Sequence, residues 1–148
     1  MSQTYFDDIE LGQQIKSSWY RVTREAIIEF GRDWDPYPFH VDEIAAKETH
    51  FGELVACTAH IFAIQSLLTH DLGEDLALLS GLGGDGLNLL LPVRADDELR
   101  LVRTYTDKRE SRSKPDRGIV GIEHSLERRN GDIVFRTTGS ILVKRRPV

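Results

Sequence analysis

The sequence is poor in cysteine, in long apolar runs and in net positive charge, and each shortage excludes a class of protein. Its single cysteine, Cys57, excludes a disulfide within the chain and a zinc site built on several cysteines. No stretch approaches about 18 consecutive apolar residues, so we expect no membrane-spanning helix. The net charge of −5 argues against binding of nucleic acid along a broad surface.

Length and composition are those of an ordinary globular protein. The 148 residues predict one domain, residues 1–148, with a core of its own. Hydrophobic residues make up 40% and charged residues 29%, as is typical of globular chains. The first residues lack the basic start and apolar run of a secretory signal. Together with the single thiol, this favours a reducing, cytoplasmic setting.

The first half of the sequence predicts helices and loops. Thr23 is a plausible N-cap for a helix that runs to about residue 32. Pro36 disfavours helical geometry at the residue before it, so this helix must end shortly before that proline. Asp42 is a plausible N-cap for a second, short helix over residues 43–48.

Residues 55–72 are almost entirely apolar or small, and they predict the longest helix of the chain. A helix that is hydrophobic nearly all round is a buried one. So much apolar surface needs elements that surround it, and a curved sheet is the natural solution.

The second half predicts that sheet, because apolar and polar residues alternate along it. Asn130-Gly131-Asp132 is a strong hairpin turn signal. The glycine-rich residues 81–86 lack the lysine of a phosphate-binding loop, so their glycines predict close backbone packing or a bulge. The expected strands are residues 15–22, 76–79, 87–93, 98–106, 119–126 and 133–144.

Helices followed by strands predict an α+β domain. A long central helix followed by four or five mostly antiparallel strands is the layout of a hot-dog fold, in which a curved sheet wraps a central helix. Such a sheet leaves an edge strand unpaired. A second copy of the chain could continue the sheet, so we expect a homodimer or a higher homo-oligomer.

Asp35 and His40 are the strongest candidates for chemistry. They lie in a segment that two prolines stiffen, between two predicted helices. A stiff segment can hold a carboxylate and an imidazole in fixed positions, and such a pair exchanges protons near neutral pH. From these residues alone, a turn whose aspartate caps a helix and whose histidine packs against an aromatic ring stays an alternative.

The surrounding residues resemble a known family. Asp35-Pro36-Tyr37-Pro38-Phe39-His40-Val41-Asp42 resembles the Asp-Pro-x-Pro-Phe-His-x-Asp pattern of MaoC-like proteins. It also shares the Asp, Pro and His of Asp-x-Asn-Pro-x-His in (R)-specific enoyl-CoA hydratases, with Tyr37 at the Asn position. Residues 51–58, 91–99 and 111–118 resemble further segments of the family, in the same order. The chain is thereby identified as a member of the MaoC-like acyl dehydratase and (R)-specific enoyl-CoA hydratase family over nearly its whole length.

The resemblance implies an enzyme that adds water to the 2,3 double bond of an enoyl-CoA thioester, or removes it. Asp35 and His40 would activate the water. The backbone N–H of Thr58, which stands where the family has glycine, would bind the thioester oxygen. Such a reaction needs no metal and no cofactor other than the coenzyme A that the substrate carries.

Further substrate contacts are implied at Tyr37, Phe39, Ser66, Arg94 and Arg112. Ser66 aligns with a serine that lines the site in some hydratases, although a small residue on a buried helix is also ordinary packing. Arg94 and Arg112 could contact the phosphates of coenzyme A. The alternative for the basic region around Arg112 is a solvated loop.

Two other functions remain open. A hot-dog thioesterase would need a carboxylate on the central helix, and residues 55–68 contain none. A non-catalytic hot-dog domain that binds acyl-CoA or a partner subunit would keep the fold without the reaction. Cys57 has no base beside it in the sequence, so we interpret it as a small buried hydrophobic residue.

Overall fold

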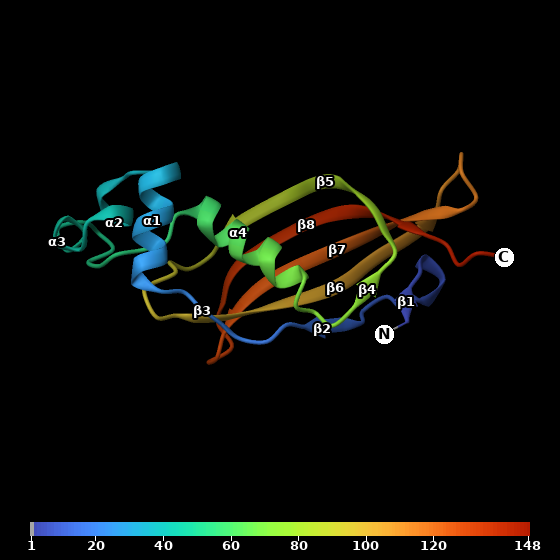
Figure 1. Ribbon diagram of the computed structural model, residues 1–148, viewed down its shortest axis with the longest axis horizontal. Helices are drawn as coiled ribbons and strands as arrows, with labels where there is room; N and C mark the ends of the chain where they lie inside the picture. The colour runs from blue at the N-terminus through green and yellow to red at the C-terminus, as the bar shows by residue number, and fades with distance from the viewer. Residues whose placement is uncertain (1) are drawn as a thin grey trace.

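The computed structural model describes residues 2–148, and its main feature is a curved antiparallel sheet with one helix lying against it (Figure 1). The strand order is β2-β6-β7-β8-β5, and β3 also pairs with β6. These strands are β2 (Gln14–Lys16), β3 (Tyr20–Arg21), β5 (Leu78–Leu89), β6 (Glu98–Glu110), β7 (Arg117–Arg128) and β8 (Ile133–Lys144). A separate ribbon pairs β1 (Gln3–Thr4) with β4 (Asp75–Leu76) in parallel.

The predicted α+β class and hot-dog fold are confirmed, and the strand positions hold with adjustments. Residues 15–22 form two short strands, β2 and β3, because the chain is interrupted at Ser17, whose hydroxyl accepts a hydrogen bond from Leu101 N. The hairpin between β7 and β8 turns at the predicted site. There, Asp132 N donates to Asn130 Oδ1 over 2.9 Å, and Gly131 adopts a φ of 92°.

The glycine-rich residues 81–86 lie inside β5, which corrects the prediction of separate strands over residues 76–79 and 87–93. Their glycines allow the close approach of β8 that the sequence predicts. A Cβ on Gly84 would lie 2.9 Å from Thr138 O, and one on Gly139 would lie 2.7 Å from Gly83 O. The pairing register shifts twice along this stretch, as expected for bulges.

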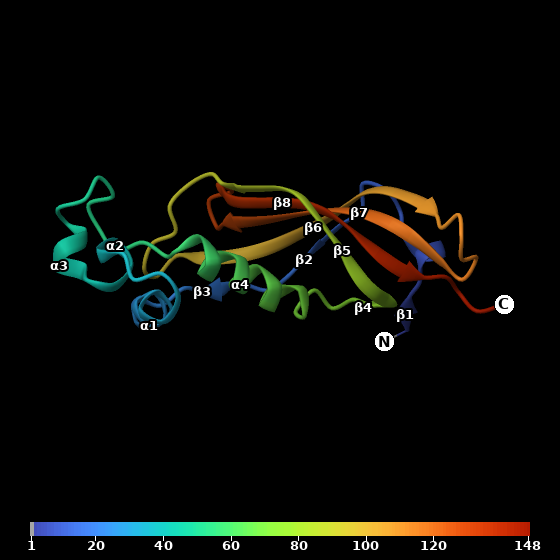
Figure 2. The same ribbon diagram turned by 90° about the horizontal axis from the view of Figure 1, so that it is seen from above.

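The helices are the 3-10 turn η1 (Phe6–Asp8), α1 (Arg24–Trp34), α2 (Pro38–Val41), α3 (Glu43–Ala46) and α4 (Thr58–Thr69). Both predicted N-caps are confirmed. Thr23 Oγ1 accepts from Ala26 N, and Asp42 Oδ1 accepts from Ile44 N and Ala45 N. Helices α1 to α3 lie together beyond one end of the sheet, as Figure 2 shows. No helix within residues 2–148 has the length and apolarity that crossing a membrane requires.

Helix α4 is shorter than the predicted helix over residues 55–72. Its expected first turn is extended instead, because Val55 forms a bridge with Arg94 and Ala56 N donates to Val93 O. The last predicted residues lie in a turn after Thr69.

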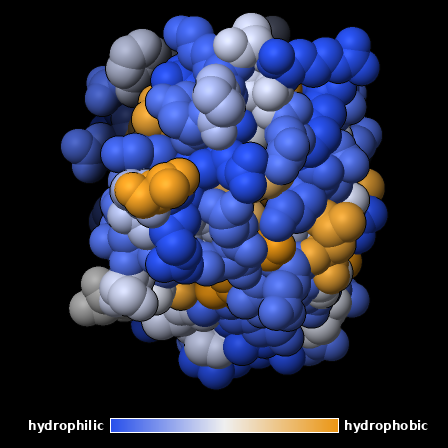
Figure 3. Space-filling view, turned by 90° about the vertical axis from the view of Figure 1, so that its right-hand side faces the viewer, coloured by the Kyte–Doolittle hydropathy of each residue, from blue (hydrophilic) through white to orange (hydrophobic). Residues whose placement is uncertain are grey.

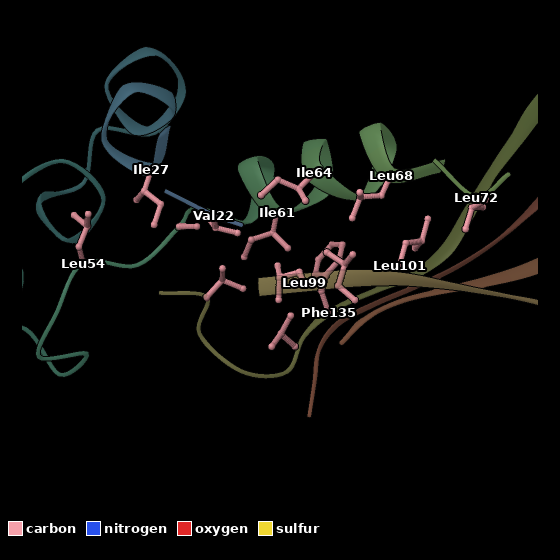
Figure 4. Packing of buried hydrophobic residues seen from close by; sticks show 14 residues of the cluster. Val22, Ile27, Leu54, Ile61, Ile64, Leu68, Leu72, Leu99, Leu101 and Phe135 are labelled. Atoms are coloured by element: carbon pink, nitrogen blue, oxygen red, sulfur yellow. The ribbon is translucent and has the colours of Figure 1, made fainter. Parts of the chain in front are cut away.

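One face of α4 forms the main core. Its buried side chains Ile61, Ile64 and Leu68 point toward Leu99 and Phe135 of the sheet (Figure 4). The opposite face is open within one chain, since Phe62 is 42% and Leu67 54% exposed. The prediction of a helix buried all round is therefore wrong for that face.

A second cluster of buried side chains fills the other end of the sheet, under η1. It includes Phe6, Tyr105 and Val120. Figure 3 views the molecule from the side that lies on the right in Figure 1, near both chain ends, and that surface is mostly hydrophilic. Exposed large apolar side chains are frequent on α4, along β5 and in the residues that follow it.

Candidate active site

The two strongest candidates from the sequence, Asp35 and His40, lie next to each other in the structure. Asp35 is the residue after α1, and His40 lies in α2, so the two prolines between them set the turn. His40 Nε2 lies 3.5 Å from Asp35 Oδ2. The imidazole is buried, with 9% of its side chain exposed, whereas the Asp35 side chain is 37% exposed.

The backbone fixes the tautomer of His40. Its Nδ1 lies 2.7 Å from Val55 O, and a carbonyl oxygen only accepts, so Nδ1 carries the proton in this contact. In the neutral ring, Nε2 is then an acceptor that faces a second acceptor, the Asp35 carboxylate. Two acceptors form no hydrogen bond with each other, and a molecule with two O–H donors, such as water, in contact with both atoms would satisfy them across the 3.5 Å gap.

Val55 holds α2 in place from the backbone. Its N–H donates to Phe39 O over 3.0 Å, and its carbonyl accepts from the His40 ring. The same residue bridges to Arg94, so α2 is tied to the loop before β6.

Gly31 on α1 provides the other support of His40. A Cβ at this position would lie 2.9 Å from His40 O and 3.0 Å from His40 Cβ. The helix can approach α2 this closely only because Gly31 has no side chain. Sequence reasoning missed both Gly31 and Val55, because a glycine inside a helix and a valine before one carry no local signal of contact with residue 40.

A cavity of about 320 Å³ opens in front of this pair. Asp35 and His40 line one side, and Thr58 lines another as the first residue of α4. The first N–H groups of a helix have no partner within it, and the helix N-terminus favours negative charge. Within the cavity, the carboxylate, the imidazole and a helix N-terminus therefore converge. Its apolar walls come from Phe39, Phe51, Val55, Ala56, Leu89, Leu90, Leu91 and Pro92.

Of the other predicted substrate contacts near the cavity, one lines its wall and two lie outside the lining. Phe39 lines the wall, and Tyr37 stacks on Phe39 at 5.5 Å but is 60% exposed and outside the lining. Arg94 lies near the rim, where its Nε is 3.1 Å from Glu53 Oε2. Neither residue lines the cavity, although the Tyr37 ring lies edge-on to the His40 ring, with 6.5 Å between their centroids.

Ser66 and Arg112 are not brought to this cavity. Ser66 lies two turns along α4 from Thr58 and lines a different cavity. Arg112 lies in the loop after β6, and the 13 residues of that strand separate it from the α1 end by about 40 Å. Figure 1 places the β6–β7 loop at the opposite end of the sheet from α2. Within one chain, Arg112 is thus remote from His40.

Cys57 precedes Thr58, close to the cavity. It is buried, and burial raises the pKa of its thiol. A raised pKa keeps the sulfur protonated and weakly nucleophilic, in line with the interpretation of Cys57 as a packing residue.

Comparison with known proteins places the chain in a family. The model of the MaoC like domain matches residues 8–127. The MaoC-like dehydratase from Rhodospirillum rubrum is 34% identical and superposes with a TM-score of 0.88, over 98% of this chain and 99% of that one. The uncharacterized Bacillus subtilis protein YdeM is 28% identical over 142 residues, 94% of this chain and 98% of its own.

An (R)-hydratase, PhaJ1 from Pseudomonas aeruginosa, shares the fold at 19% identity. Its TM-score is 0.76, and the alignment covers 96% of this chain and 86% of PhaJ1. The family match spans most of the chain and includes both residues of the Asp35–His40 pair. The chain belongs to the MaoC-like domain family.

Proposed function

We propose that the protein is a hydratase or dehydratase that acts on the 2,3 double bond of an enoyl-CoA thioester. The observation that carries the proposal is the position of His40 Nε2 and Asp35 Oδ2, two acceptors 3.5 Å apart at the wall of an apolar cavity. A relative at 34% identity bears the name of a MaoC-like dehydratase, which supports the same reaction class.

In this proposal, a water donates one O–H to His40 and the other to Asp35. One of the two groups takes a proton as the water oxygen bonds to C3 of the enoyl thioester. The electron pair of the double bond moves toward the thioester carbonyl, and the proton taken from the water is delivered to C2 as that pair returns. The sum is addition of one water, so the reaction needs no oxidant or reductant, and the reverse steps remove the water.

Negative charge develops on the thioester oxygen during this addition. The N–H of Thr58, at the start of α4, is the proposed donor to that oxygen. The Thr58 side chain narrows the same cavity, so we expect it to affect which acyl groups fit.

The proposed partner set is limited to the substrate and a second copy of the chain. Phe39 would contact the acyl group, and Tyr37 and Arg94 would border the entrance, with Arg94 available to the phosphates of coenzyme A. Strand β5 ends the sheet order, and its leucines are exposed, which supports pairing with a second copy. We also propose a cytoplasmic location, because thioester metabolism occurs there and its reducing conditions keep a free thiol reduced.

The test is a panel of purified 2-enoyl-CoA substrates, followed by loss of the absorbance of the conjugated thioester. Asp35→Asn and His40→Ala should each lower kcat at least about 100-fold, because each removes one of the two groups that activate the water. Asp33→Asn and His50→Ala are matched controls, since both residues are exposed and outside the cavity lining. Full activity of Asp35→Asn would contradict the role of that residue.

The same assay separates the alternatives. Release of the free thiol of coenzyme A would indicate a thioesterase, although helix α4 carries no carboxylate. Tight acyl-CoA binding with no reaction on any substrate would indicate a non-catalytic binding domain.

A further inference from the structure

A second, larger cavity of about 870 Å³ lies between α4 and the strands β5, β7 and β8. The walls of the two cavities are formed by neighbouring residues of the same helix and strand. Thr58 and Leu89 line the first cavity, while Phe62, one helical turn further, and Leu87, two strand residues back, line the second. A chain that leaves Thr58 along α4 therefore enters the second cavity. The glycines of β5 line it without side chains that would fill it.

The wall of this cavity carries a buried amide that is only half satisfied. Gln65 is 3% exposed, and its Nε2 donates to Thr137 Oγ1 over 2.9 Å. Its Oε1 has no hydrogen-bond partner within residues 2–148. If the positions of Oε1 and Nε2 are exchanged, Nε2 becomes the atom without a hydrogen-bond partner. Either orientation of the amide therefore leaves one polar atom unsatisfied. Such a group costs free energy unless something binds to it.

His124 is the second polar side chain of this wall. It is 8% exposed, and its Nε2 accepts from Arg103 Nε over 3.0 Å. Because an arginine N–H only donates, the neutral His124 ring keeps its proton on Nδ1. Burial and the charge of Arg103 lower the pKa of His124 to about 4, so the ring is neutral at physiological pH.

The charges around the cavity disfavour an anionic ligand. Asp85 lines the cavity, and no lysine or arginine does so among the residues that the structure describes. Arg103, behind His124, is already paired with Glu74, with Nη1 3.1 Å from Oε1. A neutral group that both donates and accepts would satisfy Gln65 and His124, whereas a carboxylate would meet the repulsion of Asp85.

We propose that the cavity beside Gln65 and His124 binds the far end of the acyl group, and that it selects a substrate with a hydroxyl there over one that ends in a plain alkyl or a carboxylate. This inference rests on the proposed function, because it takes the thioester to be held at Thr58. Gln65 lies seven residues from Thr58, or about 10 Å along the helix, which is the reach of about eight bonded atoms in an extended chain.

The test compares three purified substrates with eight acyl carbons each: 2-octenoyl-CoA, its 8-hydroxy derivative and 2-octenedioyl-CoA, in which C8 is a carboxylate. We expect kcat/KM to be about tenfold higher for the hydroxy substrate than for the alkyl one, the effect of one hydrogen bond to a group otherwise left unpaired. The carboxyl substrate should be the poorest. Equal values for the hydroxy and alkyl substrates, or a preference for the carboxyl one, would overturn the inference.

Gln65→Met keeps the length of the side chain and removes its polar atoms. It should abolish the preference for the hydroxy substrate and leave the hydration of the four-carbon 2-butenoyl-CoA unchanged, because that acyl group is too short to reach residue 65. Gln14→Met is the matched control, since Gln14 makes the same contact with Thr104 on an exposed strand. If Gln65→Met fails to fold, Thr137→Val, which changes the partner of Gln65, should alter the same ratio.

Failure of the proposed function is distinguishable from failure of this inference. If no enoyl-CoA reacts, including 2-butenoyl-CoA, the proposed function fails. Calorimetry with octanoyl-CoA and 8-hydroxyoctanoyl-CoA then decides the inference on binding alone. Tighter binding of the hydroxy compound that is lost in Gln65→Met supports the polar cavity, and equal Kd values overturn it.

Discussion

At the scale of single residues, the proposed oxyanion role of the Thr58 N–H can be tested separately from any role of the Thr58 side chain. Thr58 is the first residue of α4, where proline is tolerated because that N–H has no partner in the helix. Cys57 before it is extended, with φ −73° and ψ 156°, which is the geometry that a residue before proline prefers.

We therefore expect Thr58→Pro to fold and to lose activity. Removal of one donor to a developing oxyanion lowers kcat on the order of 100-fold. Thr58→Ala keeps the N–H and should retain kcat within a few fold, with changes confined to which acyl groups are accepted. Steady-state kinetics of both variants, with circular dichroism as the check on folding, measure the difference. Equal activity of the two variants would remove the oxyanion role from this N–H.

His124 illustrates how a buried network affects stability. Arg103 lies between His124 and Glu74, and the hydroxyl of Tyr105 donates to Glu74 as well. The pKa of His124 falls from 6.5 to about 4 through burial and the adjacent Arg103. Below pH 6.5, His124 becomes protonated in the unfolded chain but stays neutral in the native state. The free energy of unfolding therefore falls as the pH falls from 6.5 toward 4.

The predicted effect is a loss of about 2 kcal/mol between pH 8 and pH 5 from His124 alone. His124→Gln removes the titrating group. Between pH 8 and pH 5, the free energy of unfolding of this variant should therefore fall by about 2 kcal/mol less than that of the wild type. Urea unfolding at the two pH values measures both proteins. The pKa of His60 is also lowered by burial, but it contributes equally to wild type and variant and cancels in the comparison. An identical pH dependence of the two would show that His124 is not neutral in the native state.

At the scale of elements, the contact between α1 and α2 determines the geometry of the candidate site. Gly31 provides the close approach, and alanine is intrinsically the better helix former. In Gly31→Ala, the new methyl group meets the backbone of His40, so α2 must move away.

We expect Gly31→Ala to remain folded and to lower kcat by about tenfold or more, because a displacement of the order of 1 Å is enough to disturb a catalytic pair. Glu29→Ala on the exposed face of the same helix is the control and should leave kcat unchanged. Measuring kcat together with the melting temperature separates displacement of α2 from general destabilisation. Unchanged kcat in Gly31→Ala would mean that α2 tolerates the shift.

The helices also show which features of the structure could be predicted from neighbouring residues alone. The caps Thr23 and Asp42 were predictable because a side-chain oxygen bonds to an N–H only three residues away or fewer. The bounds of α4 were not. Residues 55–57 are as apolar as the helix that follows, and they are extended only because β-type contacts with Val93 and Arg94, far along the chain, compete with helix formation.

At the scale of the whole molecule, β5 is an unpaired edge of 12 residues with apolar side chains exposed. Leu79 is 44% and Leu82 49% exposed, and the open face of α4 lies beside it with Phe62 and Leu67. Long edges that expose apolar side chains are usually covered in stable proteins. A second copy that pairs β5 with β5 would cover strand and helix together in a symmetric dimer. It would thereby also close the outer side of the cavity beside Gln65, which the same strand and helix line.

Sedimentation at micromolar concentration should therefore give twice the mass of the 16.8 kDa chain. Leu82→Glu places a charge on the proposed interface and should shift the protein toward the monomer. Leu11→Glu is the control, because Leu11 is 56% exposed and lies outside β5. A monomeric wild type would contradict the pairing of β5.

The sequence by itself determined the α+β layout and the order of the elements, and the resemblance of the Asp35–His40 segment to a family indicated a hydratase or dehydratase. Each of these signals, a motif, a period or a cap, lies in contiguous residues. Only the tertiary structure decided which distant residues meet. In the tertiary structure, Val55 and Gly31 contact His40. Ser66 lines a second cavity with Gln65 and His124, and Arg112 lies at the opposite end of the sheet. The physical reason is that these contacts depend on the register and curvature of strands far apart in the chain, which no local pattern specifies.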